Sequence, residues 1–262
     1  MQIKQPQLQI ARSYTPLPPS ESDDGSSAHD LRFLIRRDPH GEVSGYLHKL
    51  PLNASLDLRG PQIEYEIPEG VGEVLFLAGG TGIAPALQLV HTLLERESSF
   101  SGKYPKIRVL WANRRREDAL DLPKQKPQVR ESWRSSLKGS VPAVEMEIST
   151  SEPEGTCPLT DQIKLLKAKH ADHFDLKYFL DEEESFIDES VLSKYVKSNV
   201  GTESKGRGKD GQRRSLIVVS GPEGFVNYLA GPKKWSGGKE GQGPLGGLLG
   251  GLYIEGWDVQ KL

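Results

Sequence analysis

The sequence predicts an α/β plus β fold, in which a partial antiparallel barrel is followed by a doubly wound parallel sheet. Residues 1–67 are rich in proline and serine and contain short strand-like runs. From Glu73 onward, apolar runs end in glycine turns and alternate with helical segments, a pattern typical of a parallel sheet with helices on its faces. The 262 residues are enough for two domains, which we expect at 1–67 and 68–262.

Three runs in the first part have the composition of β-strands. They are residues 7–14 (QLQIARSY), 30–37 (DLRFLIRR) and 55–67 (SLDLRGPQIEYEI), and the polar segment 20–30 separates the first two. These runs predict the strands of an antiparallel sheet or barrel.

Four apolar runs in the second part predict the parallel strands. They are residues 73–78 (EVLFLA), 107–112 (IRVLWA), 143–149 (AVEMEIS) and 215–220 (SLIVVS). The run at 73–78 leads through a glycine turn into residues 83–97, which carry apolar side chains at helical spacing. A strand, a tight turn and a helix are therefore expected here.

Three other stretches differ in composition from these runs. Residues 181–185 (DEEES) and the polar run from Gly201 favour irregular structure, and we expect a flexible insert near residues 200–214. Residues 239–251 are dominated by glycine. We expect them to form a helix packed closely against the sheet, although each interior glycine costs up to about 1 kcal/mol.

Composition excludes several classes of protein and site. A net charge of −2, from 34 basic and 36 acidic residues, gives no electrostatic case for binding nucleic acid. The single cysteine, Cys157, excludes a disulfide framework and a Cys-rich metal site. No run approaches the ~20 apolar residues of a membrane-spanning helix. His170 and His173 are spaced to share a helix face, but a solvated polar segment is favoured over a metal site.

The most specific local pattern is Gly79-Gly80-Thr81-Gly82 between a buried strand and a helix. Such a turn brings backbone N–H groups and a helix N-terminus toward an anion or a flat ring. It is not a Walker A loop, and Pro85 stands where the dinucleotide pattern G-x-G-x-x-G has its third glycine. The glycines either bind a ligand or only turn the chain.

A second turn, Ser220-Gly221-Pro222, follows another predicted strand. Because ligands of open α/β sheets bind at the carboxyl ends of the strands, two such turns predict one binding crevice there. By itself Gly221-Pro222 is also consistent with an ordinary turn.

Together with residues 11–16 (ARSYTP), these motifs resemble the ferredoxin reductase-like flavoproteins and, within them, the NADH–cytochrome b5 reductase branch. The resemblance implies FAD and NADH or NADPH as cofactors. It implies that Arg12 pairs with the flavin pyrophosphate, that Tyr14 lies against the isoalloxazine ring and that Thr15 bonds near flavin N5. A guanidinium suits a phosphate, and an aromatic face suits a flat ring.

The resemblance also assigns the remaining binding positions. On the flavin side they are Ser13, Ile35, Arg36, Gly41, Glu42, Val43 and Ser44. On the nicotinamide side they are Gly80, Thr81, Gly82, Ile83, Pro85, Gly221 and Pro222. Thr15 and Ser220 are the candidate catalytic residues, and no metal site is expected.

Two features depart from the family pattern. Ser220 stands where the family has a cysteine beside the nicotinamide, which alters a polarisable contact. Only ten residues precede residues 11–16 (ARSYTP), where the family has about half a barrel of strands, so we expect an N-terminally truncated chain. An open barrel leaves strand edges unpaired.

The motifs and the end of the chain are most similar to the fungal cytochrome c mitochondrial import factor group. This resemblance implies an FAD-dependent NAD(P)H oxidoreductase that passes electrons to a haem or ferric acceptor such as cytochrome c, at the mitochondrial inner membrane facing the intermembrane space. The alternatives are a cytochrome b5 reductase-type enzyme and a non-catalytic assembly factor.

Residues 114–116 (RRR) either favour the 2′-phosphate of NADPH or form a surface charge run.

Overall fold

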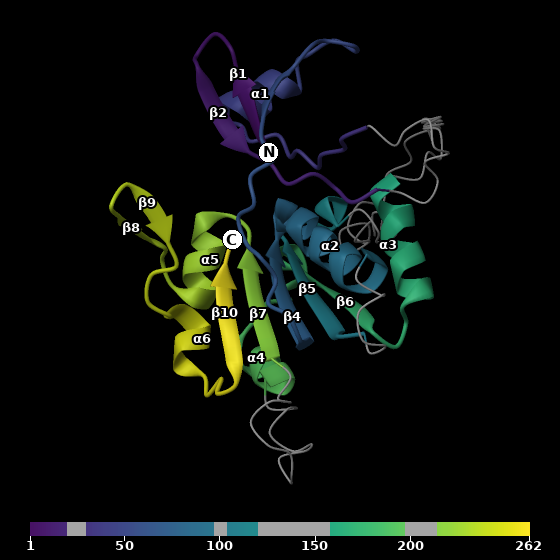
Figure 1. The fold of residues 1–262 in the computed structure, drawn as a ribbon, viewed down its shortest axis with the longest axis vertical. Coiled ribbons are helices and arrows are strands. Elements are labelled where there is room, and N and C mark those ends of the chain that lie inside the picture. The colour runs from purple at the N-terminus through teal and green to yellow at the C-terminus, as the bar shows by residue number, and fades with distance from the viewer. Residues whose placement is uncertain (20–29, 97–103, 120–157, 197–213) are drawn as a thin grey trace, which may run out of the picture.

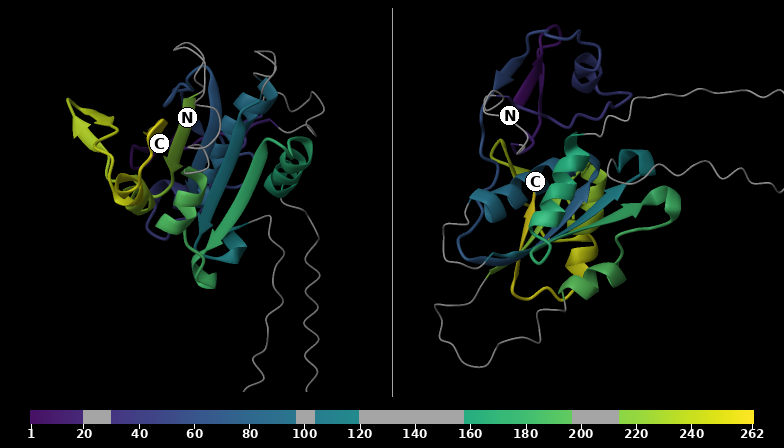
Figure 2. Two further views of the ribbon diagram at one scale, coloured as in Figure 1. Left: turned by 90° about the horizontal axis from the view of Figure 1, so that it is seen from below. Right: turned by 90° about the vertical axis from the view of Figure 1, so that its right-hand side faces the viewer.

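The computed structural model describes residues 1–19, 30–96, 104–119, 158–196 and 214–262. An antiparallel sheet formed by the N-terminal part stands apart from a five-stranded parallel sheet formed by the rest (Figures 1 and 2). This is the predicted combination of a partial antiparallel barrel and a doubly wound sheet. The strand expected at 143–149 lies outside the described residues, as does nearly all of the insert expected near 200–214.

The N-terminal sheet has the strand order β2-β1-β3, with β1 at Gln2–Gln5, β2 at Ile10–Ser13 and β3 at Asp57–Arg59. Both pairings are antiparallel. Residues alternate along β1, so that Ile3 and Gln5 are buried while Gln2 and Lys4 line the open face. Helix α1, Glu42–Leu47, contacts β1 and β2.

The strand expected at residues 30–37 does not form, and its only ladder contact with the described residues is an isolated bridge between Phe33 and Pro16. Three of the four residues 16–19 opposite this segment are prolines, which have no backbone N–H to donate to a ladder. The run expected at 55–67 is also shorter, because β3 ends at Arg59. Tyr65 and Ile67 pack instead against the core of the parallel sheet.

The parallel sheet has the strand order β10-β7-β4-β5-β6. Its strands are β4 at Val71–Gly79, β5 at Lys106–Asn113, β6 at Phe174–Leu180, β7 at Arg214–Ser220 and β10 at Trp257–Lys261. Strand β4 lies between β5 and β7 and pairs with both. The predicted apolar runs at 73–78, 107–112 and 215–220 are therefore the three central strands.

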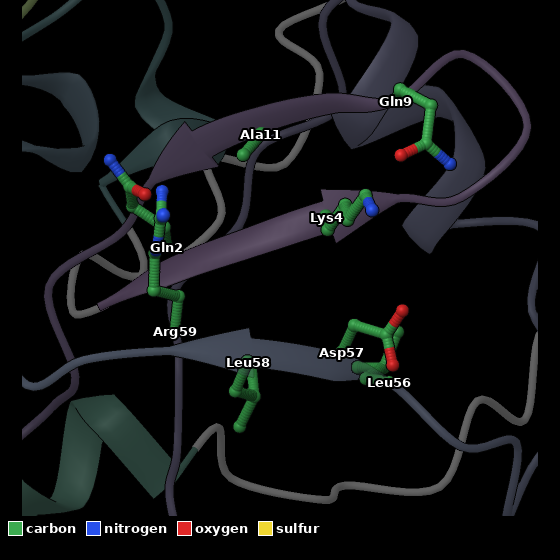
Figure 3. Close-up of a pocket in the computed structure, with 8 residues that line it drawn as sticks. All are labelled: Gln2, Lys4, Gln9, Ala11, Leu56, Asp57, Leu58 and Arg59. Carbon is green, nitrogen blue, oxygen red and sulfur yellow. The ribbon is translucent and has the colours of Figure 1, made fainter.

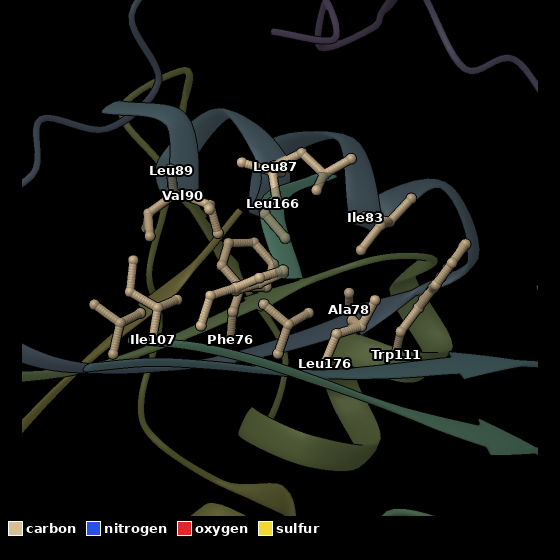
Figure 4. Packing of buried hydrophobic residues seen from close by; sticks show 14 of the residues in the cluster. Phe76, Ala78, Ile83, Leu87, Leu89, Val90, Ile107, Trp111, Leu166 and Leu176 are labelled. Carbon is tan, nitrogen blue, oxygen red and sulfur yellow. The ribbon is translucent and has the colours of Figure 1, made fainter. Parts of the chain in front are cut away.

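Helices cover both faces of this sheet. On one face lie α2 at Ile83–His91, its π-helical continuation η2 at Thr92–Arg96 and α3 at Pro158–Lys169, packed on Val74, Phe76 and Ala78 of β4. Figure 4 shows this cluster beneath α2. On the other face lie α4 at Glu189–Val196, α5 at Glu223–Ala230 and α6 at Gly247–Gly251, packed on Leu75 and Leu77. Successive side chains of β4 point to opposite faces of the sheet, and helices cover both faces, so residues 74–78 of the strand are all apolar.

The glycine-rich stretch forms helix α6 as expected, although over five residues only. The glycines allow close approach to α5, because a Cβ at Gly231 would lie 2.9 Å from the Cα of Gly246. Leu249 is fully buried in the core on this face of the sheet. A small hairpin, β8 at Lys234–Ser236 and β9 at Lys239–Gly241, connects α5 to α6.

His170 follows α3 and is buried, which corrects the expectation of a solvated segment. Its Nε2 lies 2.9 Å from Oε1 of Glu95, and Nζ of Lys169 lies 3.0 Å from the same oxygen. The rings of Tyr104 and His173 are 5.4 Å apart beside this pair. The cluster joins η2 to the end of α3.

Glu95 is expected to make stability depend on pH on the acid side. Burial alone raises its pKa, but hydrogen bonds from His170 and Lys169 outweigh burial and lower it below the ordinary value of 4.5. The free energy of unfolding gained from this shift is present above about pH 4.5 and is lost as pH falls through the lowered pKa. Urea unfolding from pH 7 to pH 3 should therefore show a smaller acid loss in Glu95→Gln, and an unchanged loss would contradict this role.

Candidate functional site

Three central strands of the parallel sheet end at one edge. Strand β4 ends at Gly79, β5 at Asn113 and β7 at Ser220. The turn η1, Gly80–Gly82, leads from β4 directly into α2. The two predicted glycine turns are thus neighbours, since β4 and β7 pair up to Ala78 and Ser220.

The backbones of these two turns are in close contact. A Cβ at Gly82 would overlap the carbonyl oxygen of Ser220 and lie 2.7 Å from its carbonyl carbon. A Cβ at Gly221 would lie 2.9 Å from the Cα of Gly79, and Gly221 has a φ of +157°. Glycine is required at these positions because the chains could not otherwise approach.

Gly80 adopts a φ of +55°, and a buried side chain holds its carbonyl group. Trp111 of β5 donates from Nε1 to the carbonyl oxygen of Gly80 at 2.8 Å, and its side chain is 1% exposed. Figure 4 shows Trp111 beneath the start of α2. Trp111 therefore fixes the turn from below, while Thr81 is exposed at its tip.

The R-S-Y-T motif lies at the end of β2 in the N-terminal sheet. Arg12 and Ser13 are exposed, and Tyr14 and Thr15 are half-buried. The backbone N–H of Tyr14 donates to the carbonyl oxygen of Met1 at 2.8 Å. Burial raises the pKa of Tyr14, although the nearby Arg12 charge opposes the rise. Tyr14 therefore remains a neutral phenol at physiological pH.

The turn at residues 41–44 lies beside this motif. Nη2 of Arg12 is 3.9 Å from Oε2 of Glu42, the first residue of α1. Ser44 is buried, and its Oγ accepts from the N–H of Asp38 at 3.1 Å and donates to the carbonyl of Gly41 at 3.3 Å. The structure thus brings two predicted flavin-side segments together, and the Ser44 hydroxyl shapes the turn.

Arg36 connects the N-terminal part to the edge of the parallel sheet. Its Nη2 is 3.3 Å from Oδ2 of Asp118, and a Cβ built on Gly80 would lie 3.8 Å from its Nη1. Its neighbour Ile35 is half-buried, and the carbonyl of Ile35 lies 3.0 Å from Nε2 of His48. Residues predicted for the flavin side and for the nicotinamide side therefore meet at Arg36.

A buried donor at this edge has no partner in the described part of the chain. Nδ2 of Asn113, the last residue of β5, is buried without a hydrogen bond. Unpaired buried polar groups are rare in folded proteins and often mark functional positions. An amide donor at the carboxyl end of a parallel strand fits the polar groups of a bound nucleotide.

The arginine run at 114–116 faces an acidic turn. The turn η4, Asp181–Glu183, follows β6, the strand beside β5. Arg116 pairs with Glu183 at 2.7 Å, and its backbone N–H donates to Glu182. Arg115 pairs with Glu117 at 2.9 Å. Carboxylates thus engage two of the three arginines.

A hollow of about 860 Å³ lies on the open face of β2-β1-β3 (Figure 3). It is lined by both apolar and charged side chains, namely Gln2, Lys4, Gln9, Ala11, Leu56, Asp57, Leu58 and Arg59. None of the predicted cofactor residues is among them. The hollow therefore does not mark the predicted cofactor site.

Neither a membrane-spanning helix nor a cluster of metal ligands occurs among the described residues. No helix there is both long and apolar enough to cross a membrane. No group of three or more potential metal ligands occurs in the same ranges.

The sequence did not reveal Trp111, Asn113 and Asp118 as parts of the site. Each lies on or just after strand β5. A polar residue directly after the predicted apolar run 107–112 was the available signal for Asn113. The contact between Trp111 and Gly80 joins positions 31 residues apart and has no local signature.

Two family models match the chain. The oxidoreductase FAD-binding domain matches residues 1–67, and the oxidoreductase NAD-binding domain matches residues 76–133. The first includes the R-S-Y-T motif and the turn at 41–44, and the second includes the glycine turn and Trp111.

Curated relatives are similar over different lengths. NADH-cytochrome b5 reductase 2-A of Vanderwaltozyma polyspora is 23% identical over 244 residues, which cover 92% of this chain and 63% of the relative. The cytochrome c mitochondrial import factor CYC2 of Saccharomyces cerevisiae is 31% identical over 144 residues, covering 39% of this chain and 38% of the relative. The chain thus spans less than two thirds of the length of these relatives.

A solved structure shares the fold. A mutant ferredoxin-NADP+ reductase of Plasmodium falciparum, in complex with 2′P-AMP, aligns with a TM-score of 0.52 at 13% identity, over 86% of this chain and 73% of that one. Along this chain the FAD-binding match precedes the NAD-binding match. In its two matched domains and in its fold the chain is therefore similar to the ferredoxin reductase-like superfamily, and the matched domains indicate FAD and NAD(P)H as cofactors.

Proposed function

We propose that the protein is an FAD-dependent oxidoreductase that oxidises NADH and passes the electrons to haem iron. One observation carries this proposal: Arg36 lies between the flavin-side segments and the Gly80 turn. Two cofactors held on either side of this residue would have their reactive rings close together. Proximity of this kind is the main contribution a protein makes to cofactor chemistry.

On the flavin side, Arg12 and the turn at 41–44 would hold the pyrophosphate. The guanidinium supplies the charge, and the turn, shaped by Ser44, supplies backbone N–H groups. Tyr14 offers a half-buried neutral ring for the isoalloxazine, and Thr15 follows directly with a hydroxyl for its reactive edge. Ser13 and Ile35 would contribute backbone contacts.

On the nicotinamide side, the backbones of residues 80–83 would approach the ring and keep side chains away from it. Pro85 fixes the first turn of α2, and Gly221 with Pro222 bounds the opposite side. Ser220 is buried at the end of β7 and would contact the ring through a small polar side chain. Bound FAD supplies the redox chemistry by accepting a hydride and releasing single electrons.

The acidic turn favours NADH over NADPH. Near an adenosine ribose, a carboxylate suits the free 2′-hydroxyl, whereas an uncompensated arginine suits a 2′-phosphate. Glu183 and Glu117 already engage Arg116 and Arg115. The acidic turn would also repel a phosphate, since like charges in close contact cost several kcal/mol.

For the acceptor we propose a haem protein in mitochondria, with haem reduction in cytochrome c maturation as the role. The similarity to CYC2 and to a cytochrome b5 reductase supports a haem acceptor. The alternatives are a b5 reductase-type enzyme and a non-catalytic factor that retains the fold. Placement at the inner membrane facing the intermembrane space is part of this proposal.

Anaerobic flavin spectroscopy tests the proposal. The chain is purified with added FAD, its bound flavin is measured by absorbance, and NADH or NADPH is added without oxygen. We expect NADH to bleach the flavin at least about tenfold faster than NADPH, and ferric cytochrome c added afterwards to be reduced. A chain that retains no flavin, or whose flavin neither nucleotide bleaches, would support the non-catalytic alternative.

A further inference from the structure

A short proline-rich segment, residues 16–19 (PLPP), runs from the R-S-Y-T motif across the parallel-sheet part of the molecule. Nε2 of Gln88 on α2 donates to the carbonyl oxygen of Pro16 at 2.8 Å. Nε2 of Gln162 on α3 donates to the carbonyl oxygens of Pro18 at 3.2 Å and Pro19 at 3.1 Å. Figure 1 shows this segment leaving β2 toward α2 and α3. We call residues 16–19 the proline strap.

The strap is stiff and is held from both sides. Its three prolines have φ fixed at about −65° and lose little conformational entropy when the segment becomes ordered. From the N-terminal part, Arg32 donates from Nη2 to the carbonyl of Pro18 at 2.8 Å, and its own carbonyl accepts from the N–H of Leu17 at 2.7 Å. Leu17 packs against the core of the parallel sheet.

The two glutamines link the strap to the part of the molecule that carries the glycine turn. Gln88 lies on α2, the helix that begins directly after Gly82. Gln162 is buried on α3, and its Oε1 has no hydrogen-bond partner in the described residues, so its amide group serves the strap alone. A chain of fixed groups thus runs from Thr15 through the strap and Gln88 to the Gly80–Gly82 turn.

We infer that Gln88 and Gln162 are positioning residues, which set the distance between the R-S-Y-T motif and the glycine turn without touching either cofactor. This inference rests on the proposed function. Transfer of a hydride, with its two electrons, from dihydronicotinamide to flavin oxidises the nucleotide and reduces the flavin. It requires reacting atoms about 3–3.5 Å apart, and a misplacement of about 1 Å can cost about 100-fold in rate.

Replacing each glutamine with leucine, which keeps most of the volume but has no donor, tests this role. In stopped-flow measurements without oxygen, we expect Gln88→Leu and Gln162→Leu each to slow flavin reduction by about tenfold, and the double variant by about 100-fold. Flavin content and the Kd for NADH should stay within about twofold of the parent. The matched control is Val196→Ala on α4, which destabilises the opposite face of the sheet without reaching the strap.

Hydrogen exchange of the cofactor-free protein provides a second readout. In the double variant, the amides of residues 12–15 and of Leu17 should exchange at least about tenfold faster, while those of β4 keep their protection. Unchanged exchange and an unchanged reduction rate in the double variant would overturn the inference, as would an equal rate loss in Val196→Ala. If the parent chain binds no flavin, the proposed function fails, and hydrogen exchange still decides whether the glutamines order the strap.

Discussion

Replacing Gly82 with alanine is expected to destabilise the protein by about 3 kcal/mol or more and to abolish reduction of the flavin by NADH. The added Cβ would overlap the carbonyl oxygen of Ser220 and lie 3.1 Å from the backbone nitrogen of Gly221. Backbone atoms cannot rotate out of the way, so the two turns must separate, and overpacking of this kind costs about 1–3 kcal/mol or more. Urea unfolding and anaerobic flavin bleaching measure the two effects.

This loss is steric rather than conformational. Gly82 has φ −60° and ψ −7°, which alanine adopts without strain. Gly224 on α5 is the matched control, because a Cβ there meets nothing within 4 Å. Gly224→Ala should stabilise the protein by about 0.5–1 kcal/mol through helix propensity. A Gly82→Ala protein as stable as the parent would show that the two turns do not make this contact.

The central strands could be predicted from the sequence because burial on both faces leaves a continuous apolar run. Strands β4, β5 and β7 all show it. The edge strands do not: β6 alternates buried and exposed residues over its first four positions, Phe174 to Lys177, and β10 contains mostly polar residues. For this reason β6, which pairs with β5, was not among the predicted strands, and the strand expected at 143–149 lies outside the described residues.

The glycine turns of the site were predictable because the need for glycine is local. Gly82 and Gly221 stand at strand ends, where a short turn must admit a second backbone. The contacts that fix the turns are not local: Gln88 reaches a carbonyl 72 residues away, and Gln162 reaches one 144 residues away. No periodicity encodes such a pair. The failure of 30–37 as a strand likewise depended on the prolines at 16–19 lying opposite.

Replacing Trp111 with alanine is expected to cost about 3–5 kcal/mol, the usual loss for removing a fully buried aromatic side chain. The indole is 1% exposed and lies 5.6 Å from the ring of Tyr178, centroid to centroid. Its N–H also satisfies the carbonyl oxygen of Gly80. The alanine variant should therefore unfold at much lower urea concentration and lose affinity for NADH.

Trp111→Phe separates these two contributions. Phenylalanine keeps most of the apolar contact but has no N–H, so the Gly80 carbonyl loses its buried donor at a cost of about 1–3 kcal/mol. Because Gly80 holds a left-handed φ of +55°, an unanchored turn is free to relax toward commoner conformations. We therefore expect the KM for NADH to rise several-fold in Trp111→Phe, with flavin content unchanged. An unaltered KM would mean that the indole fills the core without positioning the nicotinamide turn.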